Sequence, residues 1–286
     1  MVRSPPLRGV LPGISNVTSA AEGCPGPTRS EQLDRLDQRA PGRTRLKAAG
    51  AAALSAAVGR LPARYQVPWQ HDFKALVTQR LRPGAVVLDV GSGRTPAIPA
   101  SDRPAGCTYV GLDISAQELQ QAPPGSYDEI VVSDITSPHP ELAERFDLVL
   151  SWQALEHVKP MRAALDNLYG YLKPGGELVA QFSGTFSVHA IANRVVPRPV
   201  SMWLLERLLK RPPDTVFHAY YDGCWYSSVR SMLSAWSRVD VEPVWLGAGY
   251  FTFFPPLAGV YVAYEEWARL SGHRNLAPYY LVQAVR

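Results

Sequence analysis

The stretch Val86–Gly93 runs from five mostly apolar residues into a turn that contains two glycines. An apolar run rich in β-branched residues is typical of a strand covered on both faces of a parallel sheet. Gly91 and Gly93 let the backbone bend sharply and approach a ligand without a Cβ in the way. A second strand, Tyr109–Asp113, ends in a carboxylate 20 residues after Gly93, the spacing at which α/β folds place an acid on a ribose diol. The pattern predicts an α/β fold with a nucleoside site at this turn.

The residues of the turn indicate which nucleoside cofactor fits. Dinucleotide sites use a third glycine, as in G-x-G-x-x-G, for close helix packing beneath the pyrophosphate, and Pro96 stands at that position. The Gly-Lys-Ser/Thr ending of a phosphate-binding loop is also missing from the turn. Asp89 precedes the first glycine by two residues, where a buried negative charge repels a pyrophosphate and attracts a cation. S-adenosylmethionine, with its sulfonium and ammonium groups, fits this pattern better than NAD does.

From about residue 65 to residue 286 the chain resembles the class I S-adenosylmethionine-dependent methyltransferases of the small-molecule and sugar type. Five motifs carry the resemblance, in the order of the family: Leu88–Gly93, Val110–Asp113, Val132–Ile135, Phe146–Ser151 followed by Leu155–Val158, and Leu172–Leu178. The resemblance implies a Rossmann-like, doubly wound seven-stranded sheet with an antiparallel C-terminal strand pair and a helical lid insertion. It also implies an enzyme that transfers a methyl group from S-adenosylmethionine.

The resemblance gives cofactor-binding roles to residues near the strand ends. Asp113 binds the ribose hydroxyls, for which a carboxylate offers two acceptor oxygens. Its alternative role is a helix cap, but Ser115 is the better cap because Glu118 follows it by three residues. The implied adenine site has Asp134 on the amino group, with the ring between Ile114 and Ile135. The remaining cofactor residues are Asp89, Gly91, Ser92, Gly93 and Ser151.

The residues after the fourth strand argue against methylation of nucleic-acid bases. Enzymes that methylate base amino groups carry Asn/Asp-Pro-Pro-Tyr/Phe there, whereas this chain has Ser151–Ala154. A hydroxyl acceptor needs its proton removed as the methyl group arrives, and an imidazole titrates near the working pH. His157 and His189 are therefore the candidate catalytic bases, with packing at the strand end as the alternative for His157. A cluster near His218 is a candidate acceptor pocket or a piece of core: Tyr220, Tyr221, Trp225 and Tyr226.

The sequence favours O-methylation of a small molecule or of a sugar unit in a glycan or lipid-linked precursor. One alternative is a nicotinamide-dependent oxidoreductase, which Pro96 and Asp89 disfavour. Another is a non-catalytic scaffold that keeps the cofactor fold in order to bind a partner. The sequence indicates neither the acceptor nor the oligomeric state.

The chain divides into a tail and one domain. Residues 1–45 hold scattered Pro, Gly, Ser and Arg without apolar periodicity, so we expect a disordered N-terminal tail. Residues 46–286 are expected to form the methyltransferase domain, with the lid insertion at about residues 183–223. A helix is expected over Arg64–Leu81. The prolines after the glycine turn shorten or replace the helix that normally follows it: Pro96, Pro99 and Pro104.

The charge balance and the cysteines of the sequence narrow the possible binding partners and the cellular compartment. Lysine and arginine number 29 against 25 aspartate and glutamate, and this small excess lies toward the N-terminus, unlike a nucleic-acid footprint. Cys24, Cys107 and Cys224 have no spacing that suggests a disulfide framework or a zinc site. We therefore expect a cytoplasmic protein without a nucleic-acid partner. The sequence indicates no metal site and does not decide whether a metal assists. Abundant Arg, Ala and Pro indicate a bacterial source.

Two apolar segments raise the question of membrane contact. Val244–Tyr264 holds no charged residue, at a length that a transmembrane span requires, but glycines and prolines in its middle favour a strand followed by a helix. Val200–Lys210 is amphipathic and is expected to form a lid helix over the active site. Peripheral membrane contact is the alternative for this helix.

Overall fold

The computed structural model describes residues 61–188, 190–191, 218–251 and 254–286. The chain divides into two units, Met1–Ala52 and Ala53–Arg286, and the described residues all belong to the second. The predicted tail and the segment Val200–Lys210 lie outside the described residues, as does most of the predicted lid insertion.

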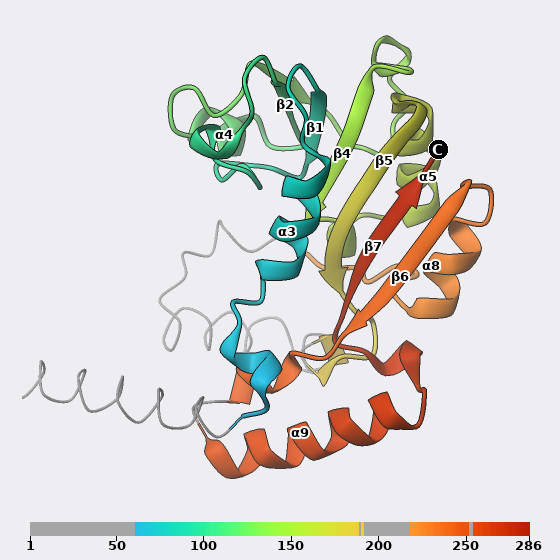
Figure 1. The fold of residues 1–286 in the computed structure, drawn as a ribbon. Coiled ribbons are helices and arrows are strands. Elements are labelled where there is room, and N and C mark those ends of the chain that lie inside the picture. Colours follow the sequence, from blue (N-terminus) through green and yellow to red (C-terminus); the bar gives the residue numbers. More distant parts are fainter. Residues whose placement is uncertain (1–60, 189, 192–217, 252–253) are drawn as a thin grey trace, which may run out of the picture. The chain divides into compact units, whose positions relative to one another are not determined.

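A seven-stranded sheet forms the centre of the domain, in the order β3-β2-β1-β4-β5-β7-β6 (Figure 1). β1 to β5 are parallel, and β7 runs antiparallel between β5 and β6. This arrangement confirms the predicted seven-stranded sheet with its antiparallel C-terminal pair. The strands are β1 Val86–Val90, β2 Thr108–Asp113, β3 Glu129–Val132, β4 Phe146–Trp152, β5 Leu172–Ser183, β6 Arg238–Val244 and β7 Tyr279–Val285.

The helices are α3 His71–Arg80, α4 Ala116–Gln120, α5 Met161–Tyr171, α8 Tyr226–Met232 and α9 Pro255–Leu270. Helices α3 and α5 lie on opposite faces of the sheet, whereas α9 lies across the end of the sheet at which β7 begins (Figure 1). Because side chains alternate across a strand, Val87 of β1 packs with Phe73 and Val77 of α3, whereas Leu88 packs in a second cluster with Leu168 of α5. Among the described helices, none is long and apolar enough to cross a membrane.

Short 3-10 helices lie in several connections between these elements. They are η1 Ala63–Gln66, η2 Ala100–Asp102, η3 Pro140–Leu142, η4 Leu155–His157, η6 Gly247–Phe251 and η7 Arg274–Leu276. The segment after the glycine turn holds only η2, in agreement with the expectation that its prolines replace a full helix.

The helix expected over Arg64–Leu81 is wrong in extent. The structure has η1 first and starts α3 only at His71. Pro68 accounts for the break, because a proline ring disfavours helical backbone at the preceding residue, and Val67 is extended with ψ 137°. The residues between η1 and α3 are thereby free to form a wall of the pocket described below.

Strand register brings the predicted site residues to one edge of the sheet. Val90, the last residue of β1, pairs with Leu112 of β2 and with Ser151 of β4. The glycine turn, the end of β2 and the loop after β4 therefore lie side by side at the carboxyl ends of the strands. The strand order reverses between β1 and β4, and open α/β sheets bind their ligands at such a switch point.

Candidate functional site

The backbone of the glycine turn after β1 lies close to neighbouring segments of the chain. Gly91 and Gly93 have φ angles of +70° and +49°, in the left-handed region that glycine adopts without a steric penalty. The Gly91 N–H donates to the Leu112 carbonyl at 2.7 Å. The Gly93 carbonyl accepts a hydrogen bond from the Tyr127 hydroxyl at 2.8 Å. The geometry of the turn therefore favours glycine at both positions.

Asp113 lies directly beside this turn and is almost fully buried. Its Oδ2 accepts a hydrogen bond from the Gly93 N–H at 3.0 Å, and its Oδ1 accepts one from the Ser115 N–H at 2.8 Å. Burial raises the pKa of this carboxyl, and the two backbone donors oppose the rise. Because a carboxylate has about four acceptor sites, it has capacity for further donors.

Ser115 caps helix α4, as the sequence predicts. Its Oγ accepts a hydrogen bond from the Glu118 N–H at 3.2 Å. The Glu118 carboxylate does not complete the capping box, because it accepts from the Arg94 guanidinium at 2.7 Å. Ser115 therefore supplies the side-chain cap of α4, and the Asp113 carboxylate contacts the glycine turn instead.

Asp89 is buried on the α3 face of the sheet. Its Oδ2 accepts hydrogen bonds from the Ala97 N–H and from the Tyr109 hydroxyl, both at 2.8 Å. Burial raises the pKa of the Asp89 carboxyl to about 6, although these two donors and Arg103 favour the charged form. Asp89 thus fastens the proline-rich loop to the core, and its predicted contact with a cofactor stays a prediction.

The residues predicted to hold adenine differ in exposure. Ile114 is 64% exposed beside the site, whereas Ile135 is 5% exposed and packs in the core. Asp134 lies at the surface, where its Oδ1 accepts hydrogen bonds from the backbone N–H and the hydroxyl of Thr136. Ser92 and Ser151 are buried, and the Ser151 hydroxyl donates to the Val90 carbonyl at 3.3 Å. The roles of these residues toward a cofactor remain predictions.

A buried carboxyl, Glu156, lies in η4 after the end of β4. It is 3% exposed, and its Oε1 accepts a hydrogen bond from the Ser183 N–H at 3.3 Å. Its Oε2 is buried and has no hydrogen-bond partner among the described residues. Burial raises the pKa of this carboxyl. The sequence pairs Glu156 with His157 but does not reveal its burial, since only the fold brings β5 against η4.

His157 lies next to this acid at the same edge. Its Nδ1 is 3.0 Å from the His218 carbonyl oxygen. A carbonyl only accepts hydrogen bonds, so Nδ1 carries a proton and Nε2 is the basic nitrogen of the neutral ring. His189, the other predicted base, lies outside the described residues.

The aromatic cluster near His218 does not form one pocket wall. Tyr221 is buried in the main core, whereas Tyr220 is exposed. The hydroxyl of Tyr226 accepts a hydrogen bond from the Arg274 guanidinium at 2.6 Å. Core packing therefore accounts for Tyr221, and hydrogen bonding at the surface accounts for Tyr226.

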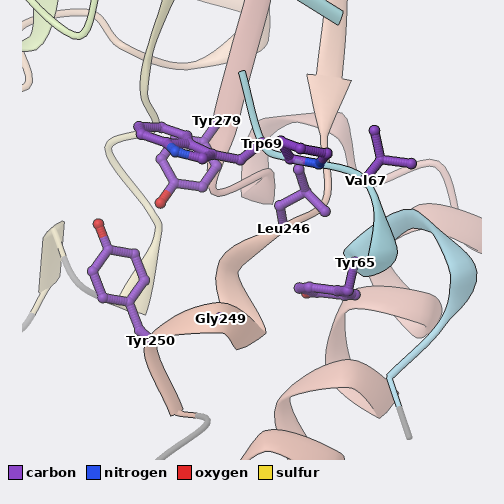
Figure 2. Close-up of a pocket in the computed structure, with 8 residues that line it drawn as sticks. Tyr65, Val67, Trp69, Leu246, Gly249, Tyr250 and Tyr279 are labelled. Carbon is purple, nitrogen blue, oxygen red and sulfur yellow. The ribbon is translucent and has the colours of Figure 1, made fainter. Parts of the chain in front are cut away.

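A different group of rings surrounds a pocket of about 400 Å³, shown in Figure 2. We call it the aromatic pocket; its rings are Tyr65, Trp69, Tyr250 and Tyr279. Tyr65 comes from η1, Trp69 from the segment before α3, Tyr250 from η6 and Tyr279 from the start of β7. The sequence gives no signal for this pocket, because its rings come from four separate segments.

Buried Glu265 of α9 holds η1 beside this pocket. Its Oε2 accepts hydrogen bonds from the Tyr65 hydroxyl and, at 3.2 Å, from the Arg64 guanidinium. Its Oε1 accepts one from the Gly247 N–H at 2.7 Å. A single carboxylate therefore ties η1, η6 and α9 together. No group of three His, Cys, Asp or Glu side chains among the described residues is placed to hold a metal ion.

Comparison with known proteins assigns the chain to a family. Residues 63–241 match the model of a family described as a methyltransferase domain, which is more than half of the chain. The chain belongs to this methyltransferase family. S-adenosylmethionine is the cofactor of the family, which decides against the nicotinamide-dependent alternative.

Two curated relatives resemble part of the methyltransferase. They are malonyl-[acyl-carrier protein] O-methyltransferases, one from Enterobacter lignolyticus, 36% identical over 134 residues, and one from Salmonella typhimurium, 35% identical over 130 residues. The matched segments cover 44% and 43% of this chain and 51% of each relative. The methyltransferase thus spans about half the length of the curated relatives that it matches.

Solved structures resemble the methyltransferase more distantly. One is phosphoethanolamine N-methyltransferase 2 from Haemonchus contortus in complex with S-adenosylmethionine, with 15% identity and a TM-score of 0.47 over 76% of this chain and 52% of that one. Another is an S-adenosylmethionine-dependent methyltransferase from Mesorhizobium loti, with 18% identity and a TM-score of 0.47 over 76% of this chain and 96% of that one.

Proposed function

We propose that this protein binds S-adenosylmethionine at the glycine turn and methylates a hydroxyl oxygen of a small molecule or sugar unit. The observation that carries the proposal is the shared sheet edge, where the glycine turn, Asp113 and His157 follow the ends of β1, β2 and β4. When bound, S-adenosylmethionine supplies an electrophilic methyl group.

The residues at the turn fit this cofactor. Asp113 accepts hydrogen bonds from the ribose hydroxyls with the acceptor capacity that Gly93 and Ser115 leave. Gly91 and Gly93 keep the backbone open to the ligand, since they carry no Cβ and adopt left-handed φ angles without a steric penalty. Asp89, two residues before Gly91, suits a cationic ligand better than a pyrophosphate. Ile114 contributes an exposed apolar side chain beside the ribose acid.

His157 is proposed as the general base. The His218 carbonyl fixes the proton on Nδ1, so Nε2 takes the proton of the acceptor hydroxyl as its oxygen binds the methyl carbon. The rest of the catalysis is positioning and exclusion of water, which an in-line transfer chiefly needs.

Two measurements test the proposal. Calorimetry with S-adenosylhomocysteine, the demethylated product, and with NAD is expected to show binding of the first only. Transfer of labelled methyl groups to phenols and sugars is then followed in wild type and in His157→Gln, which is expected to lower kcat by about 10²-fold or more. Binding of S-adenosylhomocysteine without any transfer would support a non-catalytic scaffold.

Methylation of a carboxyl group is the second candidate function, because the curated relatives are named for O-methylation of a malonyl group on acyl-carrier protein. The two products differ in chemistry. A methyl ester releases methanol in dilute alkali, whereas a methyl ether is stable. Alkali treatment of the labelled product therefore separates carboxyl from hydroxyl acceptors.

A further inference from the structure

The aromatic pocket lies at the same sheet edge as the proposed transfer site. The ring centroids of Trp69 and Trp152 are 4.7 Å apart, and Trp152 follows Ser151 at the end of β4. On the other side, Tyr279 pairs with Ser183 at the end of β5. A molecule in the pocket therefore lies at the ends of β4 and β5, the same sheet edge that carries His157.

The lining of the pocket is aromatic and uncharged. Val67, Pro68, Leu246 and Gly249 complete a wall in which none of the described lining residues carries a charge. The ring centroids of Trp69 and Tyr279 are 5.7 Å apart at a tilted angle, so these two rings pack against one another in the wall and fix each other's orientation. Figure 2 shows the Tyr279 and Tyr250 hydroxyls directed toward one another, and they are hydrogen-bonded.

An acid lies behind this lining. Glu156 accepts a hydrogen bond from the backbone of Ser183, the residue that pairs with Tyr279. Burial raises the pKa of the Tyr279 hydroxyl, and Glu156 contributes to the rise. A carboxylate ligand placed here would meet this acid and would find no cation among the described lining residues, so hydroxyl donors alone would compensate the loss of its hydration less well than for a neutral ring.

We propose that the aromatic pocket binds the methyl acceptor and selects an uncharged ring that carries a hydroxyl over a carboxylate of similar shape. This inference rests on the proposed function, because it identifies the ligand of the pocket as the methyl acceptor. The rings of Trp69 and Tyr279 contact the faces and edges of the ligand ring, and the tyrosine hydroxyls supply its polar contacts.

The test uses two probes with one ring system, 2-naphthol and 2-naphthoate, titrated by calorimetry into the full chain saturated with S-adenosylhomocysteine. We expect 2-naphthol to bind at least about tenfold more tightly than 2-naphthoate. Trp69→Ala is expected to weaken 2-naphthol by about tenfold while the affinity for S-adenosylhomocysteine stays within about twofold. Trp267→Ala is the matched control, because this Trp is 53% exposed on α9 outside the pocket, and it should change neither affinity.

Equal binding of the two probes, or 2-naphthol affinity unaffected by Trp69→Ala, would overturn the inference. If Trp69→Ala does not fold, Tyr250→Ala replaces it, because Tyr250 is 52% exposed and tolerates truncation. Failure of S-adenosylhomocysteine to bind wild type would remove the proposed function alone. In that case the 2-naphthol titration without S-adenosylhomocysteine still decides whether the pocket selects neutral rings.

Discussion

Gly91 packs against Ala154 so closely that a Cβ placed on Gly91 would lie 2.2 Å from the Ala154 Cβ. The contact joins the turn after β1, where the cofactor is proposed to bind, to the loop after β4, which leads to Glu156 and His157. The two halves of the proposed site can therefore approach this closely only because residue 91 has no side chain.

We expect Gly91→Ala to destabilise the protein by about 2–4 kcal/mol, because it adds the clash with Ala154 to the cost of a left-handed alanine. Gly125→Ala is the control. Gly125 has φ +78° but open space around its Cβ position, so only about 1–2 kcal/mol is expected. Urea unfolding measures both.

The double variant Gly91→Ala with Ala154→Gly separates the clash from the backbone strain. It should recover the part of the loss that exceeds the Gly125→Ala value. Equal losses in Gly91→Ala and Gly125→Ala would contradict the close contact.

Much of the sheet follows from local pattern. Apolar runs that end before Gly91 and at Asp113 locate β1 and β2 within one residue of their observed bounds. A buried strand of a parallel sheet needs a continuous apolar run, so local sequence is sufficient there. Pro68 could have located the break between η1 and α3, since its effect on Val67 is also local.

The partners of the buried polar groups could not be predicted. Asp89 binds Ala97 and Tyr109, which requires the proline-rich loop to fold back over β1. Glu156 is buried because Ser183 of another strand lies against it. Such contacts depend on tertiary structure between segments that share no sequence pattern.

Asp89 is expected to make stability depend on pH. Its folded pKa of about 6 exceeds the unfolded value of 3.8, so the folded state binds more protons than the unfolded state between these values. Stability therefore falls as pH rises from about 4 to about 6, by about 3 kcal/mol from this group. Asp89→Asn should lose this dependence. In urea titrations, the free energy of unfolding of the variant should therefore increase relative to that of wild type as pH rises across this range.

Asp147→Asn is the control for this titration. Burial alone would raise the pKa of Asp147, but the Lys173 ammonium and the Val86 N–H lower it below its usual value. Its stabilising effect is present above the unfolded pKa and is lost only as pH falls through the lower folded value. The difference between Asp147→Asn and wild type should therefore stay constant from about pH 5 to 7. A constant difference for Asp89→Asn as well would refute the raised pKa.

Asp113→Ala should weaken the binding of S-adenosylhomocysteine by at least about tenfold, since two ribose hydrogen bonds to a charged acceptor contribute about 2–4 kcal/mol. Asp102→Ala, on the exposed η2, should leave affinity unchanged. Because Asp113 also holds the Gly93 and Ser115 N–H groups, melting temperature is recorded beside the calorimetric titration. Unchanged affinity in the folded Asp113→Ala variant would remove this residue from the site.

The last prediction concerns Glu265 and Glu266, which both pair with Arg64. The Glu265 side chain is fully buried and also accepts hydrogen bonds from Tyr65 and Gly247. Glu265→Gln removes the charge and one acceptor oxygen, leaving a buried donor without a partner, so we expect a loss of about 1–3 kcal/mol.

Glu266→Gln provides the matched control, because its side chain is 31% exposed and an exposed ion pair contributes at most about 1 kcal/mol. Tyr65 forms part of the aromatic pocket, so Glu265→Gln should also weaken 2-naphthol binding while S-adenosylhomocysteine binding persists. Equal effects of the two variants on stability and on 2-naphthol would show that Arg64 alone holds η1. A larger effect of Glu265→Gln on both would identify the buried carboxylate as the group that positions the pocket wall.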